Sequence, residues 1–171
     1  MSKPKIYVFI GKPGVGKTTL IKKVLPNIKY IDVKSYIVPH VINDKWPEEK
    51  TLDCYKKMYE DINQVNEDLI LEIGTNHAEF NVSQLERLQK MFQVVVILCI
   101  LSIEENRKRY IERDEVFDLP AFEKRLKKKF PELHLPLIVK SKLPYFLLEM
   151  GPPFEEIQKV LKGELQKLGY N

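Results

Sequence analysis

A glycine-rich octapeptide near the start of the chain, Gly11 to Thr18, constrains the fold more than any other feature. It reads GKPGVGKT and fits the pattern G-x-x-x-x-G-K-[ST] in full. An apolar stretch that predicts a strand precedes it, and a predicted helix follows. Glycines let the backbone bend so that several N–H groups point at one phosphate, and the helix N-terminus adds a partial positive charge. The octapeptide therefore predicts a nucleotide phosphate site rather than a glycine turn that only starts a helix.

Two side chains of the octapeptide have specific expected roles. Lys17 reaches the β- and γ-phosphates and follows the charge onto the transferring group, and Thr18 offers its hydroxyl to Mg²⁺. The residues of this segment expected to contact ATP are Gly11, Lys12, Pro13, Gly14, Val15, Gly16, Lys17, Thr18 and Thr19. Motors, switches and kinases all carry this pattern, so the destination of the phosphate depends on the rest of the chain.

Five apolar runs predict strands that are separated by helices. They cover residues 5–10, 28–32, 68–74, 93–101 and 145–150. The fourth run is apolar on both faces, which is typical of a central strand. This alternation predicts a parallel sheet covered by helices on both faces, with ligands at the carboxyl ends of the strands. The length of 171 residues suits a single domain, residues 1–171.

Local signals predict where several helices begin and end. Ser83 and Ser102, each followed three residues later by Glu, form capping boxes that predict two helix starts. Another helix is expected to begin near Pro47, because proline suits a first turn. A basic helix is expected over residues 120–130.

Composition and cysteine usage exclude several classes of protein. The longest apolar run, residues 94–101, is far too short to span a bilayer, and the first residues lack the apolar core of a signal peptide. Cys54 and Cys99 have no CxxC or metal spacing, so both are expected to be reduced packing residues. These features predict a cytoplasmic protein with no membrane partner. No zinc site is expected, because the histidines have no metal-spaced partners.

Positive charge is concentrated in one segment. The chain has 28 Lys and Arg against 24 Asp and Glu, a net charge of +4. Residues 107–142 hold eleven Lys and Arg against six Asp and Glu, so the rest of the chain is slightly acidic. Such a segment is compatible with a solvated helix face, with a lid that handles phosphate, or with a nucleic-acid surface.

Two carboxylates end neighbouring predicted strands. Glu72 lies near the end of the third strand, where it is expected to be the second Mg²⁺ anchor, acting through water; the alternative is an outward-facing strand carboxylate. Asp32 ends the second strand, where it is expected to orient an acceptor hydroxyl or take its proton. The alternative for Asp32 is a cap on the next turn.

Three arginines follow the fourth strand. Arg109 and Arg113 are four residues apart and so share one helix face, and Arg125 lies twelve residues further on. Arginines that converge on a phosphate loop suit phosphoryl transfer, because charge spreads over the oxygens of the transferring group. Arg113 and Arg125 are therefore expected to be catalytic. The alternative is surface arginine paired with nearby Glu or Asp side chains.

The chain resembles the nucleotide-kinase branch of the P-loop proteins, the adenylate-kinase-like group. Arg109 and Arg113 match the R-x-x-x-R pair of that family, and residues 124–126 (KRL) resemble its returning R-L after a short lid. The resemblance implies a lid over residues 107–130, Arg109 near the adenine, and a backbone contact to the base from the EMGPP stretch around Gly151. It also implies a three-layer α/β fold whose five strands have the order 2-3-1-4-5.

The acceptor half departs from that family. Residues 33–66, the expected acceptor-binding region, contain no arginine, and the stretch GTNH follows the third strand. GTNH resembles a T-N stretch in small kinases related to polynucleotide 5′-kinase, which also use an aspartate after the second strand. The glycine triplet of shikimate kinases is missing.

These observations predict Mg²⁺-dependent transfer of the γ-phosphoryl group of ATP to a small acceptor that is nucleotide-like or bears a hydroxyl. One alternative enzyme is a polynucleotide 5′-hydroxyl kinase, which would bind a strand along residues 107–142. The alternative without catalysis is a nucleotide-binding regulatory module with little turnover.

Overall fold

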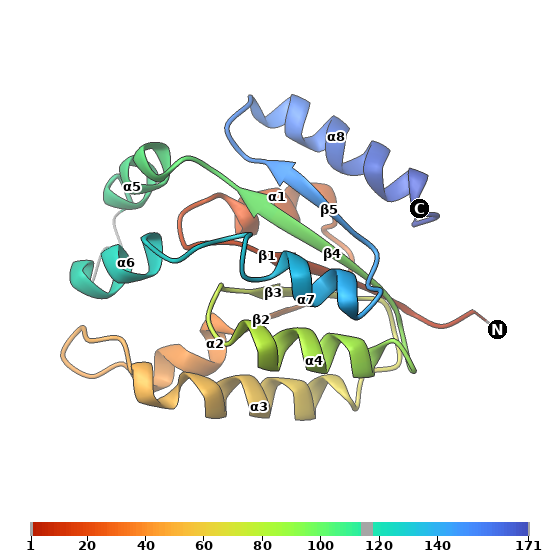
Figure 1. Ribbon diagram of the computed structural model, residues 1–171, viewed down its shortest axis with the longest axis horizontal. Helices are drawn as coiled ribbons and strands as arrows, with labels where there is room; N and C mark the ends of the chain where they lie inside the picture. The colour runs from red at the N-terminus through yellow and green to blue at the C-terminus, as the bar shows by residue number, and fades with distance from the viewer. Residues whose placement is uncertain (1, 114–117, 171) are drawn as a thin grey trace.

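The computed structural model describes residues 2–113 and 118–170 (Figure 1). Residues 114–117, which belong to the expected lid segment, lie outside the described residues. The described helices are α1 (Lys17–Val24), α2 (Lys34–Ile37), α3 (Thr51–Ile62), α4 (Ala78–Leu88), α5 (Ile103–Ile111), α6 (Leu119–Leu126), α7 (Leu135–Lys140) and α8 (Phe154–Lys167), with 3₁₀ turns η1 (Val38–His40) and η2 (Glu48–Lys50). None of them is long and apolar enough to cross a membrane.

Five parallel strands form one sheet in the order β2-β3-β1-β4-β5, as predicted. They are β1 (Lys5–Ile10), β2 (Lys29–Asp32), β3 (Leu69–Ile73), β4 (Gln93–Ile100) and β5 (Tyr145–Glu149). Because consecutive strands are parallel, every connection crosses over through a helix. All carboxyl ends therefore lie along one edge of the sheet, and the register places Asp32 directly beside Glu72 there.

Alternating strand residues enter two separate cores, which makes the fold a three-layer α/β structure. On one face, Ile6, Val8 and Ile10 of β1 pack with apolar residues of α3, α4 and α7. On the other face, Tyr7 and Phe9 pack with α1 and α8 (Figure 1). Both cysteines are buried and free, as expected.

Helices α5 and α6 lie beyond the carboxyl ends of the strands, on the left in Figure 1. They share a small core of their own, made by Tyr110, Phe122 and Leu126. The rings of Tyr110 and Phe122 are stacked with centroids 3.6 Å apart. This small core holds α6 above the edge of the sheet where ligands bind in parallel α/β folds.

Several predicted helix boundaries are wrong. Helix α4 begins at Ala78, so Ser83 lies in its interior and caps nothing. Burial explains the earlier start, because α4 places Val82 and Leu85 in the core. Ser102 does cap α5, accepting a hydrogen bond from the N–H of Glu105.

Two further helix boundaries and one additional helix also differ from the sequence expectation. Helix α3 begins at Thr51, one 3₁₀ turn after Pro47. The basic helix expected over residues 120–130 ends at Leu126, its last buried apolar residue. Helix α7 was not predicted, because its six residues are too few to show a periodic pattern.

Candidate active site

The phosphate loop between β1 and α1 has the backbone that its glycines predict. Gly14 and Gly16 have φ angles of +85° and +101°, a region that other residues rarely adopt. At Gly11 the constraint is space, because a Cβ atom there would lie 2.9 Å from the backbone oxygen of Cys99. Glycine is therefore required at positions 14 and 16 for backbone conformation and at position 11 for space.

Lys17 is held by the loop itself. Its Nζ donates to the backbone oxygens of Gly11, at 2.7 Å, and Lys12, at 3.0 Å. Burial lowers the pKa of this ammonium, and the nearby Glu72 carboxylate opposes that shift. The two carbonyl oxygens accept hydrogen bonds from Lys17 Nζ that a phosphate oxygen could accept instead. The positive charge of Lys17 is therefore already inside the loop.

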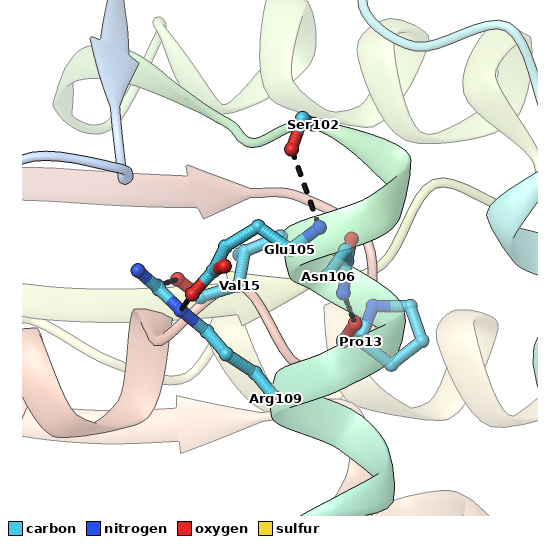
Figure 2. A network of polar contacts seen from close by, with 6 residues as sticks. All are labelled: Pro13, Val15, Ser102, Glu105, Asn106 and Arg109. Atoms are coloured by element: carbon cyan, nitrogen blue, oxygen red, sulfur yellow. Dashed lines mark hydrogen bonds and ion pairs between the residues drawn. The ribbon is translucent and has the colours of Figure 1, made fainter.

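Helix α5 fixes the backbone of the phosphate loop from one side (Figure 2). The fully buried side chain of Asn106 donates from Nδ2 to the carbonyl oxygen of Pro13 at 2.5 Å. Arg109 donates to the carbonyl oxygen of Val15 at 3.2 Å and pairs with Glu105 at 3.1 Å. The pairing of Arg109 with a neighbouring glutamate, an alternative at the sequence level, is thus present alongside the loop contact.

Asn106 is a functional residue that sequence reasoning missed. A Cβ atom on Gly14 would lie 2.9 Å from Asn106 Nδ2, so the two residues fit closely. The only local signal was an asparagine on the buried face of a helix, at the position that faces the loop. A buried amide needs hydrogen-bond partners, and that need could have pointed to the nearby backbone.

Glu72 and Thr18 are in direct contact. The Thr18 hydroxyl lies 2.9 Å and 3.0 Å from the two carboxylate oxygens of Glu72, and the Tyr30 hydroxyl also hydrogen-bonds Glu72. Glu72 is buried, and its carboxylate faces the site rather than solvent. Oxygen donors of this kind suit Mg²⁺, which takes one or two protein ligands and completes its shell with water and phosphate. The described residues hold no group of three or more His, Cys, Asp or Glu side chains that could bind a metal ion.

Asp32 lies next to Glu72, where the turn cap weighed for it is present and its role toward an acceptor stays a prediction. Its Oδ1 accepts a hydrogen bond from the N–H of Lys34 at 2.9 Å, which is a turn cap. Its other oxygen lies 3.3 Å from the Tyr30 hydroxyl, and the residue lines the site cavity. Burial and the neighbouring Glu72 carboxylate raise the pKa of Asp32. A carboxylate with a raised pKa is a stronger proton acceptor.

One cavity of about 160 Å³ joins the phosphate loop to the acceptor half. The predicted site residues that line it are Gly11, Pro13, Gly14, Val15, Gly16, Lys17, Thr18, Asp32, Glu72, Arg113 and Arg125. The other residues that line it are Val33, Lys34, Ile37, Trp46, Tyr55, Ile73, Gly74, Thr75, Asn76 and Tyr110. The fold therefore brings together residues that are up to 114 positions apart in the chain.

A second hollow lies on the other side of Gly16. Thr19 and Arg109 line it together with the apolar residues Met150, Phe154 and Ile157. Arg113 lines both hollows, and Gly151 lies between Met150 and Pro152, which line the second one. The side chain of Lys12 enters neither hollow, because it points to α6.

Arg125 lies on the acceptor side of the main cavity. Its guanidinium is stacked over the ring of Trp46, with the central carbon 4.6 Å from the ring centroid. Its Nη1 is buried and has no hydrogen-bond partner among the residues that the structure describes, and the same is true of Thr75 Oγ1. Burial is the main cause that lowers the pKa of Arg125. A desolvated cation and an unsatisfied hydroxyl thus line the same cavity, and both are groups that can donate to an anion.

The loop that follows β3 is fixed by hydrogen bonds below this cavity. Tyr55 accepts at its hydroxyl from the N–H of Gly74 at 3.2 Å, and Lys128 donates to the side-chain oxygen of Asn76. His77 contacts Thr51 through Nε2 at 2.8 Å and does not line the cavity. Of the residues that follow Gly74, Thr75 and Asn76 therefore line the cavity and His77 does not.

Left-handed backbone conformation also occurs at several residues other than glycine. Outside glycine, the described residues with positive φ are Asn43, Asp44, His77, Asp118 and Lys142. The first four lie in the loops and the cap that border the acceptor side. Asparagine and aspartate tolerate this region better than most residues, but they still pay a conformational cost.

Comparison with known proteins gives a result for the fold. No family model matches the sequence, and no curated protein matches it. Among solved structures, a gluconokinase from Sinorhizobium meliloti 1021 superposes with a TM-score of 0.65 at 13% identity, covering 98% of this chain and 95% of that one. A shikimate kinase from Acinetobacter baumannii in complex with shikimate gives 0.62 at 16% identity, covering 96% and 94%.

A third structure, of a kinase from Chloroflexus aurantiacus described as putative, gives a TM-score of 0.62 at 17% identity and covers 96% of this chain and all of that one. Similarity to shikimate kinases was not expected from the sequence, which lacks their glycine triplet. At sequence identities this low, the comparison shows that the folds are alike and shows nothing about the reaction. The chain has the five-stranded fold of the small P-loop kinases over almost its whole length.

Proposed function

We propose that the protein transfers the γ-phosphoryl group of ATP to a small acceptor that carries a hydroxyl and an anionic group. The observation that supports this most strongly is the single cavity in which the phosphate loop faces Asp32 and Arg125. A nucleotide switch needs only the loop side of such a cavity. A second wall with an acidic group and an unpaired cation fits a second substrate.

On the donor side, each group has a role in positioning phosphate. Lys17 would exchange its two carbonyl partners for the β- and γ-phosphates, and Arg113 would neutralise charge on the transferring group. The electrostatic effect of Arg113 on the pKa of Lys17 is consistent with their being near each other. Thr18 and Glu72 would hold Mg²⁺, which supplies charge neutralisation between the phosphates. The adenine would lie in the hollow of Met150 and Phe154, with Arg109 at its edge.

On the acceptor side, Asp32 would accept the proton of the acceptor hydroxyl while the hydroxyl oxygen bonds to the γ-phosphorus. The bond from that phosphorus to the β–γ bridging oxygen breaks, and ADP leaves with that oxygen. The raised pKa of Asp32 favours this proton transfer. The proton on Asp32 then passes to water when the product leaves.

Arg125 is assigned to the acceptor rather than to the transferring phosphoryl group. Tyr110 of α5 lies near it, but most of the charged and aromatic groups around it belong to the acceptor half or cap α6: Glu48, Asp118, Tyr55 and Trp46. Its unpartnered Nη1 would bind a carboxylate or phosphate of the acceptor, and Thr75 Oγ1 would donate a second hydrogen bond.

The test is a screen for ADP release from Mg·ATP with one acceptor class per reaction. The classes are neutral sugars, sugar acids, hydroxy acids, nucleosides, nucleotides and 5′-hydroxyl oligonucleotides. We expect release that requires both Mg²⁺ and an anionic hydroxyl compound, and that stops with EDTA. Rapid ADP release without any acceptor would indicate an NTPase. Tight ATP binding without turnover in every reaction would indicate a regulatory module.

A further inference from the structure

Lys12, the second residue of the phosphate loop, directs its side chain out of the loop. The side chain is 8% exposed, and its Nζ donates to the carbonyl oxygen of Leu126 at 2.6 Å. Leu126 is the last residue of α6, so its carbonyl has no partner within the helix. A cation at a helix C-terminus is also favoured by the helix dipole. Lys12 therefore caps a helix that lies 114 residues away in the chain.

The same residue contacts the phosphate lysine through its backbone. The carbonyl oxygen of Lys12 accepts from Lys17 Nζ at 3.0 Å. A phosphate oxygen that accepts a hydrogen bond from Lys17 Nζ must compete with the Lys12 carbonyl oxygen for that donor. Lys12 is thus linked to the phosphate site by its main chain and to α6 by its side chain.

Helix α6 also has a link at its other end. Asp118 caps its N-terminus by accepting from the N–H of Ala121 at 3.1 Å. The second oxygen of Asp118 accepts from the backbone N–H of Trp46 at 2.6 Å, and the Trp46 ring supports Arg125. Because Arg125 lies in the last turn of α6, next to Leu126, its position depends on both ends of the helix.

We propose that Lys12 is a positioning residue that couples the phosphate loop to Arg125 through the C-terminal carbonyl of α6. The coupling orders the acceptor wall relative to the bound triphosphate. Burial of the Lys12 ammonium is unfavourable, and it lowers the pKa of that group, although Glu132 opposes the shift. A residue that served only to fill space at this position would not need a charge.

Trp46 makes the coupling measurable without catalysis, because it is the only tryptophan in the chain and it contacts Arg125. The measurements are acrylamide quenching of Trp46 fluorescence and titration with Mg·ADP. Lys12→Met keeps the length of the side chain and removes the donor, and Lys12→Arg keeps a cationic donor. Lys127→Met is the matched control, since Lys127 is an exposed lysine at the same end of α6.

We expect Lys12→Met to raise the quenching constant of Trp46 at least twofold while changing the dissociation constant of Mg·ADP less than threefold. Lys12→Arg should restore most of the protection, and Lys127→Met should match the parent. With an acceptor from the screen, Lys12→Met should lower kcat at least tenfold and leave the KM for ATP nearly unchanged.

Quenching in Lys12→Met equal to the parent would overturn the coupling. A change of more than threefold in the dissociation constant of Mg·ADP would also overturn it, because Lys12 would then act as a nucleotide ligand. If Lys12→Met does not fold, Lys12→Gln replaces it, because glutamine is too short to reach the Leu126 carbonyl. The inference deepens the proposed function, but the fluorescence result does not depend on turnover, so either can fail alone.

Discussion

The two halves of the cavity differ in how far their polar groups are satisfied by the protein. On the donor side, Lys17, Thr18 and Arg109 all have hydrogen-bond partners, and the main unpartnered atom among the described residues is Asn106 Oδ1. On the acceptor side, Arg125 Nη1 and Thr75 Oγ1 have none within the ranges described. The donor-side cation Lys17 is thus satisfied by the protein itself, whereas the acceptor-side cation Arg125 keeps a buried donor atom for a ligand. The difference suggests that substrate choice resides in the acceptor half.

The largest expected effect is on the donor side. Lys17→Ala removes the charge that follows the transferring phosphoryl group, and turnover should fall by about 10²- to 10³-fold. Stability should be retained, because the ammonium is desolvated in the folded protein. Steady-state ADP release and a thermal melt measure both quantities.

The matched control is Lys22→Ala, at an exposed lysine of the same helix α1, which should leave turnover unchanged. Equal turnover in Lys17→Ala and the parent, at equal melting temperature, would remove the phosphate loop from the mechanism.

His134 should make the stability of the protein depend on pH. Both of its ring nitrogens are buried and have no hydrogen-bond partner among the described residues. Burial, followed by repulsion from Lys128, lowers its pKa to about 4. Below the ordinary pKa of histidine the unfolded chain takes up a proton that the folded one does not. The contribution of neutral His134 to the free energy of unfolding is therefore fully present above about pH 6.5. It is lost as the pH falls to 4, and the loss amounts to about 3 kcal/mol.

Urea unfolding between pH 7 and pH 4 tests this. His134→Leu should show a flatter dependence of stability on pH than the parent, and the exposed His40→Leu should follow the parent. Parallel curves for the parent and His134→Leu would show that the buried imidazole does not titrate as expected.

Arg125→Gln tests the acceptor side of the cavity directly. Losing a charge-assisted bond to the acceptor anion should raise the KM for the acceptor by about 10- to 100-fold. The dissociation constant of ATP should change little. Arg87→Gln is the control, because Arg87 is an exposed arginine of α4 that does not line the cavity. A fall in kcat with an unchanged KM for the acceptor would return Arg125 to the transferring phosphoryl group.

Substitutions at two glycines compare a position that needs a left-handed backbone conformation with one that does not. Gly14→Ala forces a side chain to a φ of +85° and against Asn106, so it should destabilise the fold by about 1–2 kcal/mol. Gly163→Ala, in the open middle of α8, should stabilise it by up to about 1 kcal/mol. Chemical unfolding measures both, and a neutral Gly14→Ala would mean that the loop and α5 are less closely fitted than described.

The smallest expected effect concerns the basic segment. Replacing Lys127, Lys128 and Lys129 with Gln should not change oligonucleotide retention on a filter, because we expect none in the parent at low or moderate salt. Retention by the parent that weakens steeply with salt and disappears in the variant would favour a polynucleotide kinase instead.

The strands and the phosphate loop could be predicted from sequence because their signals are local. The apolar runs of β1 and β4 and the pattern around Lys17 each lie within a short window. The contacts that shape the site are not local. Asn106 meets Pro13 across 93 residues, and Lys12 meets Leu126 across 114. Nothing within a short window of the sequence marks these partners for each other.

The carboxylates illustrate an intermediate case. Glu72 and Asp32 could be placed at the edge of the sheet because they end strands, and parallel strands end together. Their joint contact with the Tyr30 hydroxyl could not be predicted, because it depends on the register of β2 against β3. The same limit explains the misplaced start of α4, where core packing prevails over a plausible capping box.

The left-handed residues around the acceptor wall have a consequence for engineering. Asn43, Asp44, His77 and Asp118 each hold a conformation that glycine adopts more easily. Selection for heat resistance alone should therefore favour glycine at some of these positions. At Asp118 and His77 such a change would also remove a side chain that holds a neighbouring segment, as Asp118 does for Trp46. A thermostable variant obtained in this way should accept a broader range of substrates and turn each of them over more slowly.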